Sequence, residues 1–148
     1  MTEQVLLSIS GLQYLEEEPS QPVEVLTMAD YYHRNGAHYL VYEEPVEGSS
    51  EVIRNTLKIK KGRVEMMKKG PIQVHMIFEE WKRQVAQYDT PFGVIPVGIQ
   101  AGEVKLTESQ YDIHVELNYV LELNEEYVTD SSVTLHVKSK DAPDFSLS

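Results

Sequence analysis

The sequence predicts one all-β domain, an antiparallel barrel that is closed or nearly closed and has roughly eight to ten strands. Three observations lead to this prediction. Apolar side chains recur at every second position over most of the chain, short turns rich in Gly, Pro and Asn separate these runs, and no connection has room for the helix of a parallel crossover. The 148 residues suit a single domain, residues 1–148, with a hydrophobic core of its own.

The clearest strand signal lies near the C-terminus. Apolar or aromatic residues alternate with mostly polar ones from Tyr111 to Leu123. Asn124-Glu125 then favours a turn, and the alternation resumes over residues 133–137. These segments predict a long hairpin, and strands of this length bend readily when they form the wall of a barrel.

Further strands are predicted wherever the period of two returns. Their ranges are 5–10, 23–33, 38–43, 53–60, 63–68, 72–78, 95–99 and 104–106. Asn35-Gly36 predicts a tight hairpin turn, because both residues tolerate positive φ. Residues 16–20 are interpreted as a charged loop, Ala101-Gly102 as a turn, and the polar residues 140–148 as a frayed tail.

Residues 78–88 allow two interpretations. Phe78, Trp81, Val85 and Tyr88 have helical spacing, and no Gly or Pro interrupts them. The alternative is a strand, a tight turn near Trp81 and a second strand. The periodicity alone leaves both open.

Composition excludes several classes of protein. The net charge is −11, and there is no cysteine, so disulfides and thiolate metal sites are excluded. No apolar run approaches the roughly 18 residues needed to span a bilayer, and the N-terminus lacks the features of a signal peptide. We therefore expect a cytoplasmic protein without a membrane span.

One segment is strongly basic within this acidic chain. Between residues 54 and 69 the only acid is Glu65, so the segment carries +6 and the rest of the chain −17. We call its cations the basic strip: Arg54, Lys58, Lys60, Lys61, Arg63, Lys68 and Lys69. The strip is either a docking patch for an anionic partner or a solvated outer face whose lysines discourage edge pairing. No aromatic residue lies within it to stack bases, so nucleic acid is not an expected partner.

A second set of candidates points into the predicted barrel. Strand parity places Asn55, Met76, Phe78, Tyr111 and Tyr119 on inward faces. They would line a lumen that holds a small molecule, or they would fill a packed core in which each hydroxyl finds a backbone partner.

No pattern of catalytic or metal-ligating residues emerges. The five histidines show no ligand-type spacing, and there is no nucleophile elbow, phosphate loop or dinucleotide fingerprint. We therefore expect no catalytic residue, no metal and no cofactor.

Three features together resemble a known family. They are the run Tyr88-Asp89-Thr90-Pro91-Phe92-Gly93, the apolar strand ending Met76-Ile77-Phe78, and the long final hairpin. The chain resembles the YwiB-like family of small bacterial proteins, whose function is uncharacterised. The resemblance implies a calycin-like barrel, of the lipocalin and fatty-acid-binding-protein type, and a strand hairpin over 78–88. The Gly-x-Trp motif of lipocalins and the Arg-x-Tyr pair of fatty-acid binders are both absent here.

The leading hypothesis is a non-enzymatic binding protein that holds a small apolar or amphipathic molecule in the barrel. The alternative is an interaction module that docks an anionic partner on the basic strip and binds no small molecule.

Overall fold

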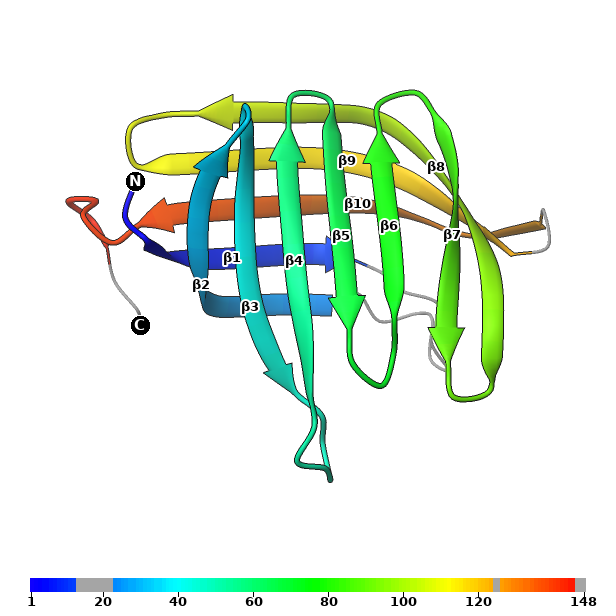
Figure 1. The fold of residues 1–148 in the computed structure, drawn as a ribbon. Helices are drawn as coiled ribbons and strands as arrows, with labels where there is room; N and C mark the ends of the chain where they lie inside the picture. The colour runs from blue at the N-terminus through cyan, green and yellow to red at the C-terminus, as the bar shows by residue number, and fades with distance from the viewer. Residues whose placement is uncertain (13–22, 124–125, 146–148) are drawn as a thin grey trace.

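Ten strands and their connecting turns make up the described part of the chain, residues 1–12, 23–123 and 126–145 of a computed structural model. The strands are β1 (Gln4–Leu12), β2 (Val23–Arg34), β3 (Ala37–Pro45), β4 (Val52–Lys60), β5 (Arg63–Lys69), β6 (Val74–Glu79), β7 (Arg83–Thr90), β8 (Gly93–Glu108), β9 (Asp112–Leu123) and β10 (Glu126–Ser139). These residues form no helix, which confirms the all-β prediction (Figure 1). The predicted loop 16–20 and turn 124–125 lie outside the described residues.

The strands form one antiparallel sheet in the order β6-β5-β4-β3-β2-β1-β10-β9-β8-β7. The first and last strands of the chain pair with each other, with Val5 opposite Ser139. The end strands of the sheet, β6 and β7, are joined by a tight turn and by one bridge. In this bridge Gln73 and Asp89 exchange two backbone hydrogen bonds of 3.0 and 2.8 Å. The sheet is therefore a nearly closed barrel, as predicted.

The barrel is flattened into two layers. Strands β3 to β7 run across β1, β9 and β10, and the long strands β2 and β8 bend from one layer to the other (Figure 1). β2 pairs with β1 from Val23 to Asp30, but with β3 only from Asp30 to Arg34. β2 and β3 therefore separate on the N-terminal side of Asp30, over residues 23–29 of β2. β8 continues through a bulge between Ala101 and Val104, where the sequence predicted a turn.

Residues 78–88 form a strand hairpin, as the family resemblance implied. The turn between β6 and β7 places Trp81 at a φ of 61°, and the Trp81 side chain is 70% exposed. The Trp81 N–H donates to the carbonyl of Gly102 at 3.2 Å, and the N–H of Glu80 donates to the carbonyl of Gly62 at 2.9 Å. The turn is thus held by neighbouring backbone groups. The helical spacing of Phe78, Trp81, Val85 and Tyr88 arises because these residues lie on β6, the turn and β7, not on one helix.

Alternate side chains of every strand meet in one core. Along β4, residues 55, 57 and 59 are buried while their neighbours are half-buried or exposed, and the same alternation recurs along β9. Gly11 lets β1 pass close to β10, because a Cβ at this position would lie 2.2 Å from the carbonyl oxygen of Ser132. Burial of this apolar set is the main source of stability.

Residues 140–145, the described part of the predicted tail, contact the end of β10. Ala142 is buried, and its N–H donates to the carbonyl of Ser139 at 3.2 Å. Lys138 and Asp144 form an ion pair of 2.8 Å. Residues 140–145 therefore make defined contacts where the sequence predicted a frayed tail, and residues 146–148 lie outside the described part.

Candidate binding sites

The centre of the barrel is filled by side chains. Met76, Phe78 and Tyr119 are each at most 2% exposed and belong to one continuous hydrophobic cluster. The rings of Phe78 and Tyr119 pack edge to face with centroids 4.9 Å apart. Tyr119 also borders an open groove of about 520 Å³ at the β8 bulge, together with Trp81.

Tyr111 does not join Tyr119 in this cluster. It lies just before β9 and is half-buried, and its hydroxyl accepts a hydrogen bond of 3.3 Å from the side chain of Gln110. Of the five predicted lumen residues, the structure brings three together in the core and places Tyr111 at one end of the barrel. Asn55 belongs to a different, polar group.

This polar group is a row of inward side chains across three neighbouring strands. Tyr42 on β3 lies opposite Asn55 on β4, and Asn55 lies opposite Lys68 on β5. Glu44 follows Tyr42 on the same face of β3. Asn55 is fully buried, Tyr42 is 7% exposed and Lys68 is 8% exposed. Buried polar side chains of this kind are uncommon in a core and require partners.

Glu44 holds this row together. Its Oε1 accepts a hydrogen bond of 2.6 Å from Lys68 Nζ and one of 3.0 Å from Asn55 Nδ2. Asn55 Nδ2 also approaches the carbonyl oxygen of Ile53 at 3.4 Å, so two acceptors fix the orientation of the amide. The opposite atom, Asn55 Oδ1, is buried and accepts no hydrogen bond from the described residues. Such an acceptor costs about 1–3 kcal/mol unless a donor reaches it.

The charge state of the row follows from these contacts. Burial alone would raise the pKa of Glu44, but hydrogen bonds from Lys68 and Asn55 and the Lys68 charge outweigh burial and hold that pKa below its ordinary value. Burial, and secondarily the Glu44 charge, raises the pKa of Tyr42 well above its ordinary value. Glu44 is therefore ionised and Tyr42 protonated at neutral pH, and Lys68 and Glu44 form an ion pair.

An open cleft adjoins this row where β2 and β3 separate. Its volume is about 360 Å³, and Tyr42 belongs to both the cleft and the polar row. The apolar part of the lining comes from Met28, Ala29 and Val41, and the rim carries the charged groups Asp30, Glu43 and Arg54. Most of these residues alternate with buried ones, so the cleft opens on the outer face of the sheet, and Ala29 and Tyr42 are its inward-facing members. The combination of apolar walls and a neighbouring polar row suits an amphipathic molecule.

The basic strip lies on the opposite side of the same strands, with one exception. Arg54, Lys58 and Lys60 alternate with buried residues on β4 and therefore face outward. Lys68 differs from the prediction, because it shares the inward face of β5 with Val64 and Met66. Two consecutive lysines on a strand must point to opposite faces, so of Lys68 and Lys69 only Lys69 lies on the outer face with the rest of the basic strip.

Acidic neighbours neutralise part of the strip. Glu65 lies 3.7 Å from Lys58 and 3.5 Å from Arg63, and Glu79 lies 3.9 Å from Arg63. Two pairs of cations stand directly opposite each other in the register: Arg54 with Lys69, and Lys60 with Arg63. Of these four, only Arg63 has an acidic partner among the described residues. Like charges in such positions destabilise a sheet.

An aromatic stack borders the strip, and the sequence analysis missed it. Tyr32 and Tyr39 are opposite each other across the β2–β3 hairpin, and their rings stack with centroids 4.7 Å apart at 6°. Lys58 Nζ lies 5.6 Å from the centre of the Tyr39 ring. This pair could have been predicted from the sequence. With a two-residue turn at Asn35-Gly36, the residues of the hairpin pair outward from the turn, and the third pair is Tyr32 with Tyr39.

A groove of about 480 Å³ lies at one end of the barrel, near the β2–β3 and β8–β9 turns. In this groove the Tyr31 hydroxyl lies 2.7 Å from His38 Nδ1, and His38 Nε2 contacts Glu108. His114 and His136 meet elsewhere, on β9 and β10, with ring centroids 6.0 Å apart. No group of three or more metal-ligating side chains occurs among the described residues.

The fold and these surfaces define a small all-β protein built as one nearly closed antiparallel barrel. The family model described as a domain of unknown function, DUF1934, matches residues 7–135, so the chain belongs to that family. A similar solved structure is the crystal structure of the ywiB protein from Bacillus subtilis. It has a TM-score of 0.75 and 16% identity, and the similarity covers 93% of this chain and 92% of that chain. This confirms the resemblance to the YwiB-like family and, at this identity, shows the fold alone.

The search of curated proteins found no match. In the described part of the chain, no helix is long and apolar enough to cross a membrane.

Proposed function

We propose that this protein is a non-enzymatic binding protein for a small amphipathic molecule that carries a neutral hydroxyl group. The observation that supports it is the buried acceptor Asn55 Oδ1, which no donor among the described residues reaches. The bound hydroxyl donates to Asn55 Oδ1, while the apolar part of the molecule lies in the cleft between β2 and β3. The binding position is thus the gap between β2 and β3 rather than the centre of the barrel, because the centre is packed.

A hydroxyl matches the row better than a carboxylate does. Asn55 Oδ1 requires a donor, which an ionised carboxylate lacks. Lys68 would attract a carboxylate, but Glu44 already compensates its charge at 2.6 Å. A second anion beside Glu44 would be repelled. The proposed ligand is therefore an alcohol rather than a fatty acid.

Displacement of Nile red, a neutral apolar dye, tests this proposal. Decanol should displace the dye more effectively than decanoate. The substitution Asn55→Leu should weaken decanol binding about tenfold, since one hydrogen bond in a buried site is worth about 1.4 kcal/mol. The matched control is Thr56→Val, the adjacent position on the outer face of β4. The proposal fails if decanol does not compete, or if it competes equally well with Asn55→Leu.

A second candidate function is docking of an anionic partner on the outer face of β4 and β5. The two like-charged pairs, Arg54 with Lys69 and Lys60 with Arg63, favour it. A bound anion would relieve the repulsion that these pairs create. A binding assay with inorganic polyphosphate at low salt tests it, with Lys60→Ala as the variant and Lys140→Ala as a charge-matched control. Equal binding by the two variants would contradict docking at this face.

A further inference from the structure

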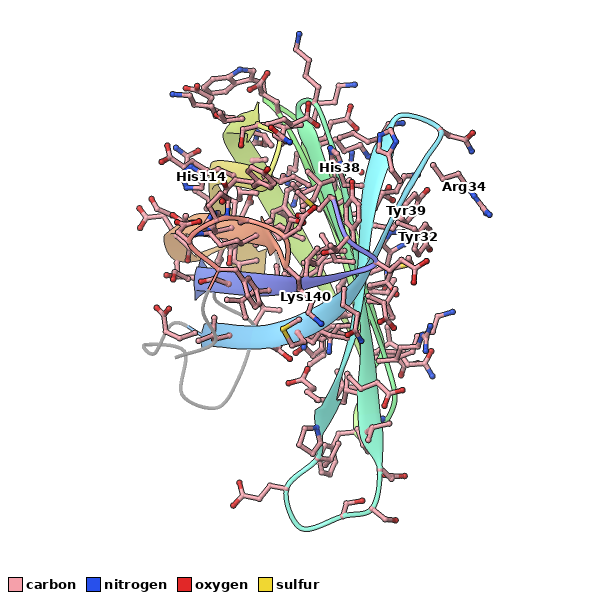
Figure 2. All side chains as sticks on the ribbon, turned by 90° about the vertical axis from the view of Figure 1, so that its left-hand side faces the viewer. Tyr32, Arg34, His38, Tyr39, His114 and Lys140 are labelled. Atoms are coloured by element: carbon pink, nitrogen blue, oxygen red, sulfur yellow. The ribbon has the colours of Figure 1, made fainter. Side chains whose placement is uncertain are left out.

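The aromatic stack of Tyr32 and Tyr39 lies on the same face of the sheet as Arg34 and Lys60, two cations that form no ion pair with the described residues. Figure 2 shows Tyr32, Arg34 and Tyr39 on the outer side of the β2–β3 hairpin, whereas His38 points to the other side. Tyr32 is 44% exposed, so one face of its ring is open while the other packs on Tyr39. Lys58 lies beside the other end of this stack.

The charges around the stack are arranged in sequence across the strands. Arg34 follows Tyr32 on the same face of β2, and Lys60 follows Lys58 on the same face of β4, with Arg63 opposite it. Within the described residues, Arg34, Lys60 and Lys61 form no ion pair. Neighbouring strands are about 4.8 Å apart, so the row from Arg34 through Lys60 to Arg63 extends over roughly 14 Å. An anion with several phosphates could span such a row.

We propose that this face binds a short single-stranded nucleic acid, with one base stacked on Tyr32 and the adjoining phosphates held by Arg34, Lys60 and Lys61. The proposal rests on the second candidate function and names its partner. Exposed aromatic rings beside cations are the means by which proteins hold single strands, because every base offers a flat face to stack. The absence of aromatics within residues 54–69 argued against this partner, but the fold supplies them from β2 and β3.

Two further features define the partner. A duplex hides the faces of its bases, so only a single strand can place a base on Tyr32. The rest of the chain carries −17, which repels a long polyanion beyond the platform. The footprint is therefore a few nucleotides, and the affinity should fall steeply as salt rises.

Fluorescence anisotropy with a labelled short oligouridylate is the test, with inorganic polyphosphate and a duplex of similar length as competitors. The single strand should compete more effectively than either. Tyr32→Leu should weaken binding at least fivefold, whereas Tyr32→Phe should keep it, because the ring is what stacks. Lys60→Ala should weaken binding and lower the salt dependence. Lys140→Ala, on the other side of the β2–β3 hairpin from Tyr32, should change neither (Figure 2).

The outcomes separate the two proposals. If polyphosphate and oligouridylate bind alike and Tyr32→Leu has no effect, the face docks anions without reading bases, and the nucleic acid proposal is overturned. If neither ligand binds, the docking function fails as well. A circular dichroism spectrum of each variant shows whether it is folded, and Tyr32→Phe decides between loss of stacking and loss of structure.

Discussion

Two lysine–glutamate pairs lie on opposite faces of the sheet formed by β3, β4 and β5. They differ in the distance between their charged atoms and in their surroundings. Lys68 and Glu44 meet inside the barrel at 2.6 Å, where the Lys68 side chain is 10% exposed. Lys58 and Glu65 meet outside at 3.7 Å, where the Lys58 side chain is 29% exposed, and Glu65 is shared with Arg63. The inner pair anchors a buried amide, while the outer pair lies beside an aromatic stack.

The comparison shows that position relative to the sheet, rather than residue type, decides what a charged pair contributes. Inside, each member compensates the charge of the other, which water solvates poorly. Removing one member therefore leaves the other with an uncompensated desolvation free energy. Outside, Glu65 is 13% exposed, but Lys58 is more exposed than Lys68 and the charged atoms are 3.7 Å apart, so the pair should contribute about 0–1 kcal/mol.

The largest expected contrast is between adjacent residues of β4 that face opposite ways. Leu57→Ala removes a fully buried side chain and should lower the free energy of unfolding by about 2–5 kcal/mol. Lys58→Ala on the outer face should lower it by less than about 1 kcal/mol. Urea denaturation of both variants measures this, and similar losses would contradict the assignment of the two faces.

The pairs themselves should differ when each lysine is replaced by methionine, which keeps most of the side-chain volume. Lys68→Met leaves Glu44 without its partner inside the barrel and should cost about 1–2 kcal/mol, less than a fully buried pair because Glu44 is partly exposed. Lys58→Met should cost about 0.5 kcal/mol or less. A greater loss for Lys58→Met would show that the interior pair is solvated.

Tyr119 distinguishes a packed interior from an open one. In the packed core that the structure shows, Tyr119→Phe removes a buried hydroxyl and should cost about 1 kcal/mol. If Tyr119 instead faced a ligand-filled lumen, stability would barely change and ligand affinity would fall. Thermal melts of both proteins, with and without decanol, measure the two quantities together.

The smallest expected effect concerns pH. The pKa of Glu44 lies below its ordinary value of 4.5, so the folded state favours the ionised form. The stability from this group is present above about pH 4.5 and is lost as the pH falls through the lower, folded pKa. Glu44→Gln should therefore flatten the acid side of the stability profile measured by urea denaturation at several pH values. Identical slopes for Glu44→Gln and wild type would contradict the role given to Glu44.

The sequence predicted the fold well because alternation is a local property. The pattern of residues 111–123 and the turn at Asn35-Gly36 depend only on neighbours along the chain, and both are found as expected. At Ala101-Gly102 the sequence predicts a turn, but β8 has a bulge there, since Gly102 suits either and only the pairing with β9 distinguishes them.

The sites were harder to predict, because they depend on which strands become neighbours. Parity alone could have placed Lys68 inside, but its pairing with Glu44 requires the register of β3, β4 and β5. The nearness of Tyr39 to Lys58 likewise comes from strand order. The unsatisfied acceptor of Asn55 depends on packing from every side and leaves no trace in the sequence.

The proposed function requires that the inner polar row, centred on Asn55, receive the hydroxyl of a bound molecule. The most direct measurement follows the side-chain amide signals of Asn55 by NMR as decanol is added to isotopically labelled protein, with the Asn55→Leu spectrum giving the assignment. These signals should shift and saturate with decanol, while those of Asn118, which lies on β9 beside Gly102 in the β8 bulge, should stay in place. Asn55 signals that do not move while decanol binds elsewhere, or the absence of any saturable change, would contradict it.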